Sequence, residues 1–256
     1  MEEVIPGCEE FHIHVSDKAC LLLHGLWGSP YEFSKLSDFL VKKNYTVNAP
    51  RYQGHGTYGK VMDKYYWLDW YNLAESRYLE LRKNYKNVYV IGFSTGATIT
   101  LKLAQKYDIE KIVSLSAFIY PTYKWFYILK PEWYLNTIGR LINYIPSIKP
   151  PNINDPIARK EYIVSEYLSI KTLRKTFELV KEVEKTIFNV TSPILIVHSK
   201  KDITTSYKSS YYIYENVSSK VKELLILEKS NHIIMLDYEK DILFEKIFEF
   251  LEKKIY

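Results

Sequence analysis

Residues 89–97 read Tyr-Val-Ile-Gly-Phe-Ser-Thr-Gly-Ala, which contains the pattern Gly-x-Ser-x-Gly around Ser94. The residues before Gly92 are β-formers, in a run short enough for a buried parallel strand. After Ser94, apolar residues follow at the spacing of a helix that packs against a sheet. The chain must therefore reverse within a few residues, and a Ser at that point lies on a sharp turn with its hydroxyl lifted clear of the sheet.

Two glycines make so tight a turn feasible. Gly92 and Gly96 lack Cβ atoms, so the strand and the helix can approach each other closely. The helix also turns its free N–H groups toward the hydroxyl of Ser94, which suits an anionic tetrahedral intermediate. A chance match to the pattern is the alternative, and the strand before it and the helix after it argue against chance.

Composition limits the class of protein. The chain has 256 residues, enough for one large α/β domain with an insertion. Its 35 basic and 30 acidic residues are spread along the chain, so a dedicated nucleic-acid surface is not expected. Cys8 and Cys20 are the only cysteines and form neither a disulfide framework nor a zinc motif. With no signal-peptide pattern and no apolar run of membrane-spanning length, we expect a cytoplasmic protein without stable membrane insertion.

Strand and helix patterns alternate through most of the chain, which predicts a mostly parallel sheet with helices on both faces. Residues 118–189 interrupt the alternation with prolines and aromatic residues and show no clear strand. We interpret them as a cap inserted between two parts of the core, residues 1–117 and 190–256. The aromatic residues near the start of the cap either line an apolar substrate pocket or form the cap's own core. The predicted strands are 11–15, 19–23, 45–49, 87–91, 111–117, 193–198 and 223–227; the predicted helices are 31–43, 63–84, 97–104, 207–216 and 238–254.

Three polar residues follow three of these strands, at the edge where open α/β sheets bind ligands. They are Ser94, Asp202 and His232, and their order along the chain is the one expected for an α/β-hydrolase triad. A Ser hydroxyl is a weak nucleophile near neutral pH and needs a base, for which the imidazole of His232 is suited. Asp202 would hold the imidazole in the right tautomer and stabilise its protonated form.

Each member of the set has a structural alternative. Asp202 follows two lysines, and its structural alternative is the N-cap of the next helix, which is less favoured than the catalytic role. His232 would otherwise be an ordinary loop histidine. The backbone N–H groups of Leu26 and Thr95 are the candidate oxyanion donors, because the His-Gly-Leu loop follows a strand end and Thr95 directly follows Ser94.

Other histidines are assigned structural places. His12 and His14 lie two residues apart on one face of an edge strand and have no third metal ligand nearby, so surface positions are favoured over a metal site. His55 is expected to hold a glycine-rich loop, and His198 to be buried within its strand. No metal or other cofactor is expected.

Beyond these individual residues, four longer stretches match a known family: Leu-Leu-Leu-His-Gly at 21–25, Ala-Pro-Arg-Tyr-Gln-Gly-His-Gly at 49–56, Gly-Phe-Ser-Thr-Gly at 92–96 and Ser-Asn-His-Ile-Ile-Met-Leu-Asp at 230–237. On these stretches the chain resembles an α/β-hydrolase of the bacterial carboxylesterase and monoacylglycerol lipase type. The resemblance implies an eight-stranded core sheet, a small cap after the sixth strand, and hydrolysis of short- to medium-chain esters or monoacylglycerols. The chain departs from the family pattern at residues 95–97 and 199–201, where family members often have Leu-Gly-Gly and a Gly before the acid.

The sequence thus predicts a cofactor-independent serine hydrolase that acts on small carboxylic esters through an acyl-enzyme on Ser94. Two alternatives stay open. One is a thioesterase or a carbon–carbon bond hydrolase on the same scaffold, since one fold supports many reactions. The other is a catalytically silent relative that binds a ligand under the cap, which an intact Ser, Asp and His set disfavours.

Overall fold

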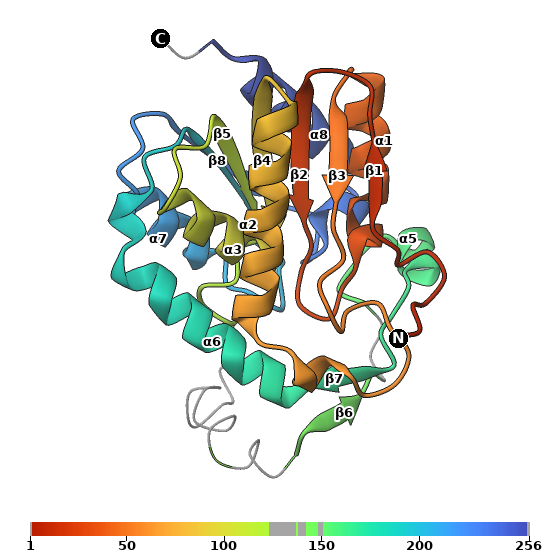
Figure 1. Ribbon diagram of the computed structural model, residues 1–256. Helices are drawn as coiled ribbons and strands as arrows, with labels where there is room; N and C mark the ends of the chain where they lie inside the picture. Colours follow the sequence, from red (N-terminus) through yellow and green to blue (C-terminus); the bar gives the residue numbers. More distant parts are fainter. Residues whose placement is uncertain (1, 123–136, 138–141, 148–150, 255–256) are drawn as a thin grey trace.

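A seven-stranded sheet lies at the centre of the computed structural model, which describes residues 2–122, 137, 142–147 and 151–254 (Figure 1). The strand order is β1-β3-β2-β4-β5-β8-β9, and every neighbouring pair is parallel except β1 with β3. All the strands that the sequence predicts are present. They are β1 (Phe11–Ile13), β2 (Lys18–Leu23), β3 (Thr46–Ala49), β4 (Asn87–Phe93), β5 (Lys111–Leu115), β8 (Ile194–Ser199) and β9 (Lys222–Leu227).

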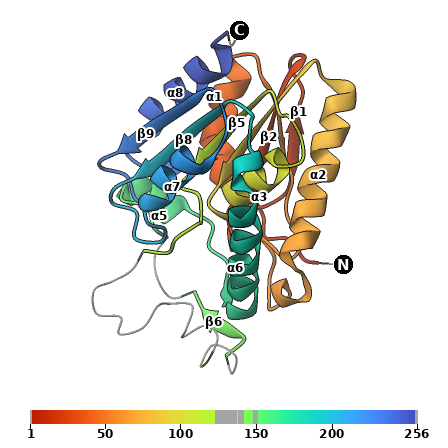
Figure 2. The ribbon, with the colours of Figure 1, turned by 90° about the vertical axis from the view of Figure 1, so that its left-hand side faces the viewer.

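The central strands are buried and mostly apolar, because helices cover both faces of the sheet. Along β4, Val88 and Val90 belong to the hydrophobic core on one face, while Tyr89 and Ile91 belong to the core on the other. This alternation follows from the two-residue period of a strand. The first core contains residues of α2 (Trp67–Asn84), α3 (Thr95–Ala104), α6 (Ile170–Lys185) and α7 (Lys208–Asn216), and the second contains residues of α1 (Ser34–Lys42) and α8 (Lys240–Glu252) (Figure 2).

The helices agree with those predicted, apart from the cap. The predicted segments at 31–43 and 63–84 each divide into a short 3₁₀ helix and an α-helix. The α-helices are α1 (Ser34–Lys42), α2 (Trp67–Asn84), α3 (Thr95–Ala104), α5 (Pro156–Glu161), α6 (Ile170–Lys185), α7 (Lys208–Asn216) and α8 (Lys240–Glu252); the 3₁₀ helices are η1 (Pro30–Phe33), η2 (Met62–Lys64), η4 (Ile187–Asn189) and η5 (Ile234–Leu236).

The number of strands corrects one expectation, because the described sheet has seven strands and not the eight that the resemblance implied. The N-terminal residues do not pair with β1. Instead, Ile5 N–H donates to Gly56 O at 2.9 Å and Tyr58 N–H donates to Glu3 O at 3.0 Å. The backbone groups of the N-terminus are therefore satisfied by the loop after β3, and β1 stays the edge strand.

The segment 118–189 also differs from expectation, because it contains two strands where none was predicted. They are β6 (Tyr144–Pro146) and β7 (Tyr167–Ser169), which pair antiparallel beyond the carboxyl ends of the main sheet (Figure 1). Three residues are too few for a strand periodicity to be recognised. The second half of α6 packs into the first core through Leu179, Val180 and Val183, so this part of the segment is joined to the core.

Several aromatic residues of the expected cap pocket (Tyr123, Trp125, Phe126, Tyr127, Trp133 and Tyr134) lie outside the described residues. Tyr120 is described, and its ring contacts that of Tyr212 with centroids 5.4 Å apart. The division of the chain at residues 118 and 189 stays a prediction.

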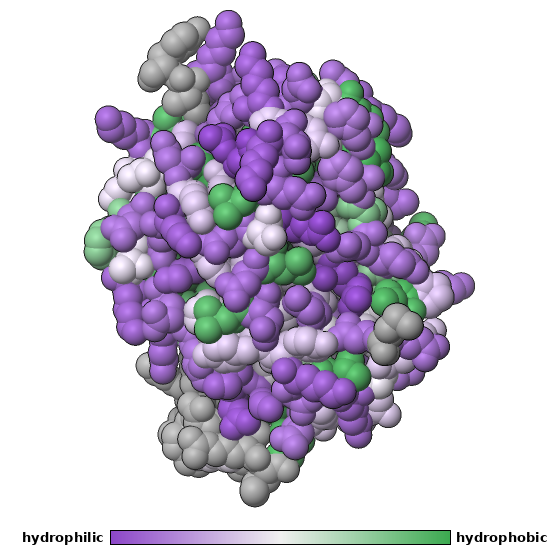
Figure 3. Space-filling model, in the orientation of Figure 1, coloured by the Kyte–Doolittle hydropathy of each residue, from purple (hydrophilic) through white to green (hydrophobic). Residues whose placement is uncertain are grey.

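The face of the molecule seen in Figure 3 is mostly hydrophilic, and its apolar residues are scattered. Scattered apolar residues are ordinary on a protein surface. Among the described helices, none combines the length and the apolar character needed to cross a bilayer.

Gly96→Ala tests the close contact between α3 and β2. An added Cβ at Gly96 would lie 1.9 Å from Leu23 O, a distance that real Cβ atoms do not show. Helix propensity alone would favour Ala by about 1 kcal/mol, but overpacking should outweigh it. We expect the free energy of unfolding, measured in urea, to fall by about 3 kcal/mol or more.

Gly59→Ala is the control, because a Cβ there meets nothing within 4 Å and suffers only from its φ of +74°. The free energy of unfolding of Gly59→Ala should be about 1 kcal/mol lower than that of the wild type. A Gly96→Ala protein no less stable than Gly59→Ala would contradict the steric explanation.

Candidate active site

Ser94 occupies a strained turn between β4 and α3. Its φ of +53° and ψ of −117° lie in a region that residues with a Cβ rarely adopt. Such strain costs about 1–3 kcal/mol and persists only where surrounding contacts impose it. Here Ser94 N–H donates to Leu115 O at 2.8 Å, and Ser94 O accepts from Phe118 N–H at 3.2 Å. These bonds to the end of β5 hold the turn in place.

His232 lies beside Ser94, 138 residues further along the chain. It follows β9, and its Nε2 is 3.0 Å from Ser94 Oγ. The ring packs against Phe93, with centroids 4.9 Å apart, and is nearly buried. Its backbone N–H donates to the side chain of Asn231 at 2.9 Å. The contact with Phe93 and the bond at the backbone N–H hold His232 in place, with its Nε2 directed at the Ser94 hydroxyl.

Asp202 completes the hydrogen-bonded chain from the loop after β8. Its Oδ2 is 2.7 Å from His232 Nδ1, while Oδ1 accepts from the N–H groups of Thr204 and Thr205 at 2.8 and 2.9 Å. Thr205 Oγ1 also donates to Oδ2 at 2.9 Å. Burial would raise the pKa of Asp202, but His232 and His198 outweigh it and hold the pKa well below its usual value. The carboxylate of Asp202 is therefore ionised at neutral pH.

The structure thus brings together Ser94, His232 and Asp202, as the sequence predicted. A proton can pass from the Ser94 hydroxyl to Nε2 of His232 while the Nδ1 proton stays bonded to Asp202. The N-cap alternative for Asp202 is wrong, because α7 begins at Lys208 and Tyr207 occupies its N-cap position. Asp202 Oδ1 instead accepts two backbone N–H groups within the loop that precedes α7, while Oδ2 faces His232.

The two candidate oxyanion donors belong to segments next to Ser94. A Cβ at Gly25 would be 3.3 Å from Ser94 Cβ, so the loop that contains Leu26 runs directly beside Ser94. Thr95 is the first residue of α3, and its N–H therefore has no acceptor within the helix. Within the described part of the chain, neither N–H donates to another group.

Sequence reasoning missed the contacts of two residues that lie near the hydrogen-bonded series of Ser94, His232 and Asp202. His198 is buried within β8, as expected, but its Nε2 also lies 3.1 Å from Asp202 Oδ2. Glu32 is only 3% exposed, and its carboxylate accepts the Gly25 N–H at 2.8 Å. The available signal was its position four residues before Leu36, on the apolar face of the predicted helix.

His12, His14 and His55, which were expected to have structural places, have other partners. His12 Nε2 and His14 Nδ1 both lie near the hydroxyl of Tyr85, at 2.9 and 3.1 Å. His55 is fully buried, and burial lowers its pKa to about 4, so it is neutral. The described ranges contain no group of three or more His, Cys, Asp or Glu residues that could hold a metal ion.

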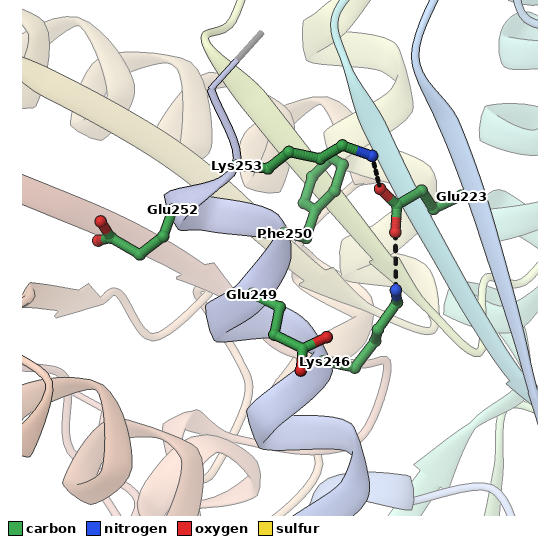
Figure 4. Close-up of a pocket in the computed structure, with 6 residues that line it drawn as sticks. All are labelled: Glu223, Lys246, Glu249, Phe250, Glu252 and Lys253. Carbon is green, nitrogen blue, oxygen red and sulfur yellow. Dashed lines mark hydrogen bonds and ion pairs between the residues drawn. The ribbon is translucent and has the colours of Figure 1, made fainter.

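A hollow of about 430 Å³ between β9 and α8 is separate from this site (Figure 4). Both lysines that line it, Lys246 and Lys253, form ion pairs with Glu223, at 2.8 and 2.7 Å. Glu223 lies at the amino end of β9, whereas Ser94 and His232 follow the carboxyl ends of their strands. The hollow is lined by Glu223, Lys246, Glu249, Phe250, Glu252 and Lys253.

Glu32→Gln tests whether burial of this carboxyl affects stability. Burial outweighs the favourable contacts of Gly25, Tyr162 and His232 and raises the pKa of Glu32 from 4.5 to about 7. A raised pKa means that the folded state holds the proton more tightly, so stability is full below pH 4.5 and is lost as the pH rises through 7. The amide of the Glu32→Gln variant does not titrate, so the variant does not lose stability in this way as the pH rises.

Urea unfolding of both proteins at pH 5 and pH 8 measures the difference. The stability of the wild type relative to Glu32→Gln should fall by about 2 kcal/mol between these pH values. A pH-independent difference would mean that Glu32 has an ordinary pKa.

Comparisons with known proteins agree with this geometry. At the sequence level, the chain is 29% identical over 251 residues to the thermostable monoacylglycerol lipase of Bacillus sp. (strain H-257), with 98% of this chain and 96% of that protein covered. It is also 29% identical over 258 residues to the carboxylesterase of Bacillus subtilis (strain 168), with 99% of each covered. These similarities extend over the whole chain and are not confined to the motifs.

Solved structures and a family model support the same assignment. One of the metagenome-derived lipolytic enzymes described as LipS and LipT superposes with a TM-score of 0.88 at 24% identity, covering 98% of this chain and 100% of that one. At this sequence identity, the structural similarity establishes the fold and not the activity. The family model described as "Serine aminopeptidase, S33" matches residues 14–239. The chain therefore has the α/β-hydrolase fold and belongs to this family of serine hydrolases.

Proposed function

We propose that this protein hydrolyses carboxylic esters, with short- to medium-chain acyl esters or monoacylglycerols as substrates, through an acyl-enzyme on Ser94. The observation that carries the proposal is the continuous chain of hydrogen bonds, 3.0 Å from Ser94 Oγ to His232 Nε2 and 2.7 Å from His232 Nδ1 to Asp202. The names of the two Bacillus relatives support the ester as substrate.

In the first half of the reaction, Ser94 Oγ attacks the carbonyl carbon and its proton moves to His232 Nε2. The carbonyl oxygen becomes an anion, which the N–H groups of Leu26 and Thr95 would stabilise. Each such donor contributes about 3 kcal/mol to transition-state stabilisation in comparable sites. The ester C–O bond then breaks, and His232 returns the proton to the departing alcohol.

In the second half, water attacks the acyl-enzyme and gives its proton to His232. The bond between the acyl carbon and Ser94 Oγ breaks, the carboxylic acid leaves, and Ser94 recovers its proton. The ionised Asp202 stabilises the imidazolium that forms in both halves, since its lowered pKa prevents it from taking the proton.

The cellular context is part of the proposal. Cys8 and Cys20 are buried and unpaired, which suits the reducing cytoplasm. The partner is a small-molecule ester; nucleic acid and stable membrane insertion have no place in the proposal.

Ser94→Ala should abolish ester hydrolysis. Loss of the nucleophile lowers kcat by about 10⁴-fold or more in comparable enzymes. The assay is a series of p-nitrophenyl esters from acetate to palmitate, where we expect a maximum at short to medium chains. The exposed Ser218→Ala is the control and should retain wild-type activity. A Ser94→Ala protein with most of its esterase activity would refute the proposal.

Further substrates address the alternatives. Amino-acid p-nitroanilides test the aminopeptidase activity that the family description names, and acyl thioesters test a thioesterase. Labelling of Ser94 by a fluorophosphonate distinguishes an active hydrolase from a silent ligand-binding relative, which should not react.

Asp202→Asn should lower kcat by about 10⁴-fold, because the amide favours the wrong tautomer of His232 and cannot stabilise its charge. KM should change little, since Asp202 lies behind the histidine. The exposed Asp241→Asn is the matched control. Near-normal kcat in a folded Asp202→Asn protein would rule out this role for Asp202.

A further inference from the structure

Glu32 lies inside the loop that carries the proposed oxyanion donor Leu26. Its Oε2 accepts the Gly25 N–H at 2.8 Å. On the other side of the loop, a Cβ added to Gly28 would lie 2.3 Å from Glu32 Oε1, so the backbone passes directly over the carboxylate. Residues 25–28 therefore wrap around one buried acidic side chain, which contacts both ends of the loop.

The second carboxylate oxygen connects this loop to the segment that follows α5. Tyr162, the first residue after that helix, donates its hydroxyl to Glu32 Oε1 at 2.9 Å. Both oxygens of Glu32 are thus occupied, one by the loop and one by the inserted segment. Because the carboxylate is almost fully buried, loss of either donor would leave one of its oxygens without a hydrogen bond and away from water, which is energetically unfavourable.

A second contact joins the same two segments directly. Ser165 Oγ donates to Trp27 O at 2.7 Å, and Trp27 has a φ of +64°, a conformation that a bulky residue adopts only under constraint. Gly25 N–H and Trp27 C=O are therefore both held, on either side of Leu26. With its two neighbours fixed, the peptide group that bears the Leu26 N–H has little freedom to rotate.

We propose that Glu32 is a positioning residue for ester hydrolysis: together with Ser165 it fixes the backbone of residues 25–27, so that the Leu26 N–H is preorganised for the oxyanion. Through Tyr162, Glu32 also makes the geometry of this donor depend on the segment after α5. The inference rests on the proposed function, and it adds a residue that does not itself contact the reacting atoms. Preorganised donors act mainly in the transition state, so the effect belongs in kcat.

Glu32→Ala removes both contacts, whereas Glu32→Gln can still accept from Gly25 N–H. With p-nitrophenyl butyrate, we expect Glu32→Ala to lower kcat about 10- to 100-fold with KM within about twofold. Glu32→Gln should stay within about threefold of the wild type. Tyr31→Phe is the control, since the Tyr31 hydroxyl donates to Glu161 O and not to Glu32.

A pair of inhibitors separates oxyanion geometry from general damage. An alkyl trifluoromethyl ketone adds the Ser94 oxygen to its carbonyl and forms an oxyanion, whereas the matched methyl ketone binds without adduct formation. Glu32→Ala should raise the inhibition constant of the trifluoromethyl ketone by the same factor by which it lowers kcat. The inhibition constant of the methyl ketone should stay within about twofold of its wild-type value. Equal weakening of both ketones, or a wild-type kcat in a folded Glu32→Ala protein, would overturn the proposal.

Tyr162→Phe and Ser165→Ala keep the proposal testable should Glu32→Ala fail to fold. Each should lower kcat about 3- to 10-fold with the same selective effect on the trifluoromethyl ketone, and wild-type values in both would overturn the proposal. Ser94→Ala is assayed in parallel. Esterase activity in Ser94→Ala would refute the proposed function, whereas an inactive Ser94→Ala beside an unaffected Glu32→Ala would refute only the role of Glu32.

Discussion

The contact between Gly96 and the backbone of β2 is the constraint on which the rest of the site depends. A Cβ at Gly96 would overlap Leu23 O at 1.9 Å, and one at Gly92 would overlap Gly96 O at 2.3 Å. Only residues without side chains let α3 start so close to two strands. Ser94 has its positive φ at this close approach, and the β2 loop, with Gly25 and Leu26, lies beside it.

Parallel strand order then gathers the other groups at the same edge. The loops after β2, β4, β8 and β9 all leave the carboxyl end of the sheet, and β5 and β8 link the Ser94 strand to the His232 strand. Residues 138 positions apart in the chain thus come within 3.0 Å of each other. The sheet acts as a rigid base, which is why polar groups on separate loops can hold hydrogen-bond geometry.

Around this edge, buried polar groups are tied to more than one element. Asp202 bonds to His232, to His198 and to the loop before α7, while Glu32 bonds to the β2 loop and to Tyr162. Charged groups removed from water are stable only when hydrogen-bonded in this way. The same bonds that offset the cost of burial also orient the site, so stability and geometry are coupled here.

The sequence by itself predicted the sheet, the turn at Ser94 and the choice of Ser94, Asp202 and His232 as candidate site residues, because continuous apolar runs, helical periodicity and the glycines around Ser94 are local signals. It did not reveal β6 and β7, since three-residue strands have no readable period, and the eighth strand implied by resemblance is replaced by contacts between the N-terminus and Gly56. Only the tertiary structure decided that Glu32 meets Gly25 and Tyr162, and that His198 meets Asp202. Those pairings depend on where the β2 loop, the segment after α5 and the β8 loop lie in space, and no pattern of neighbouring residues encodes that arrangement.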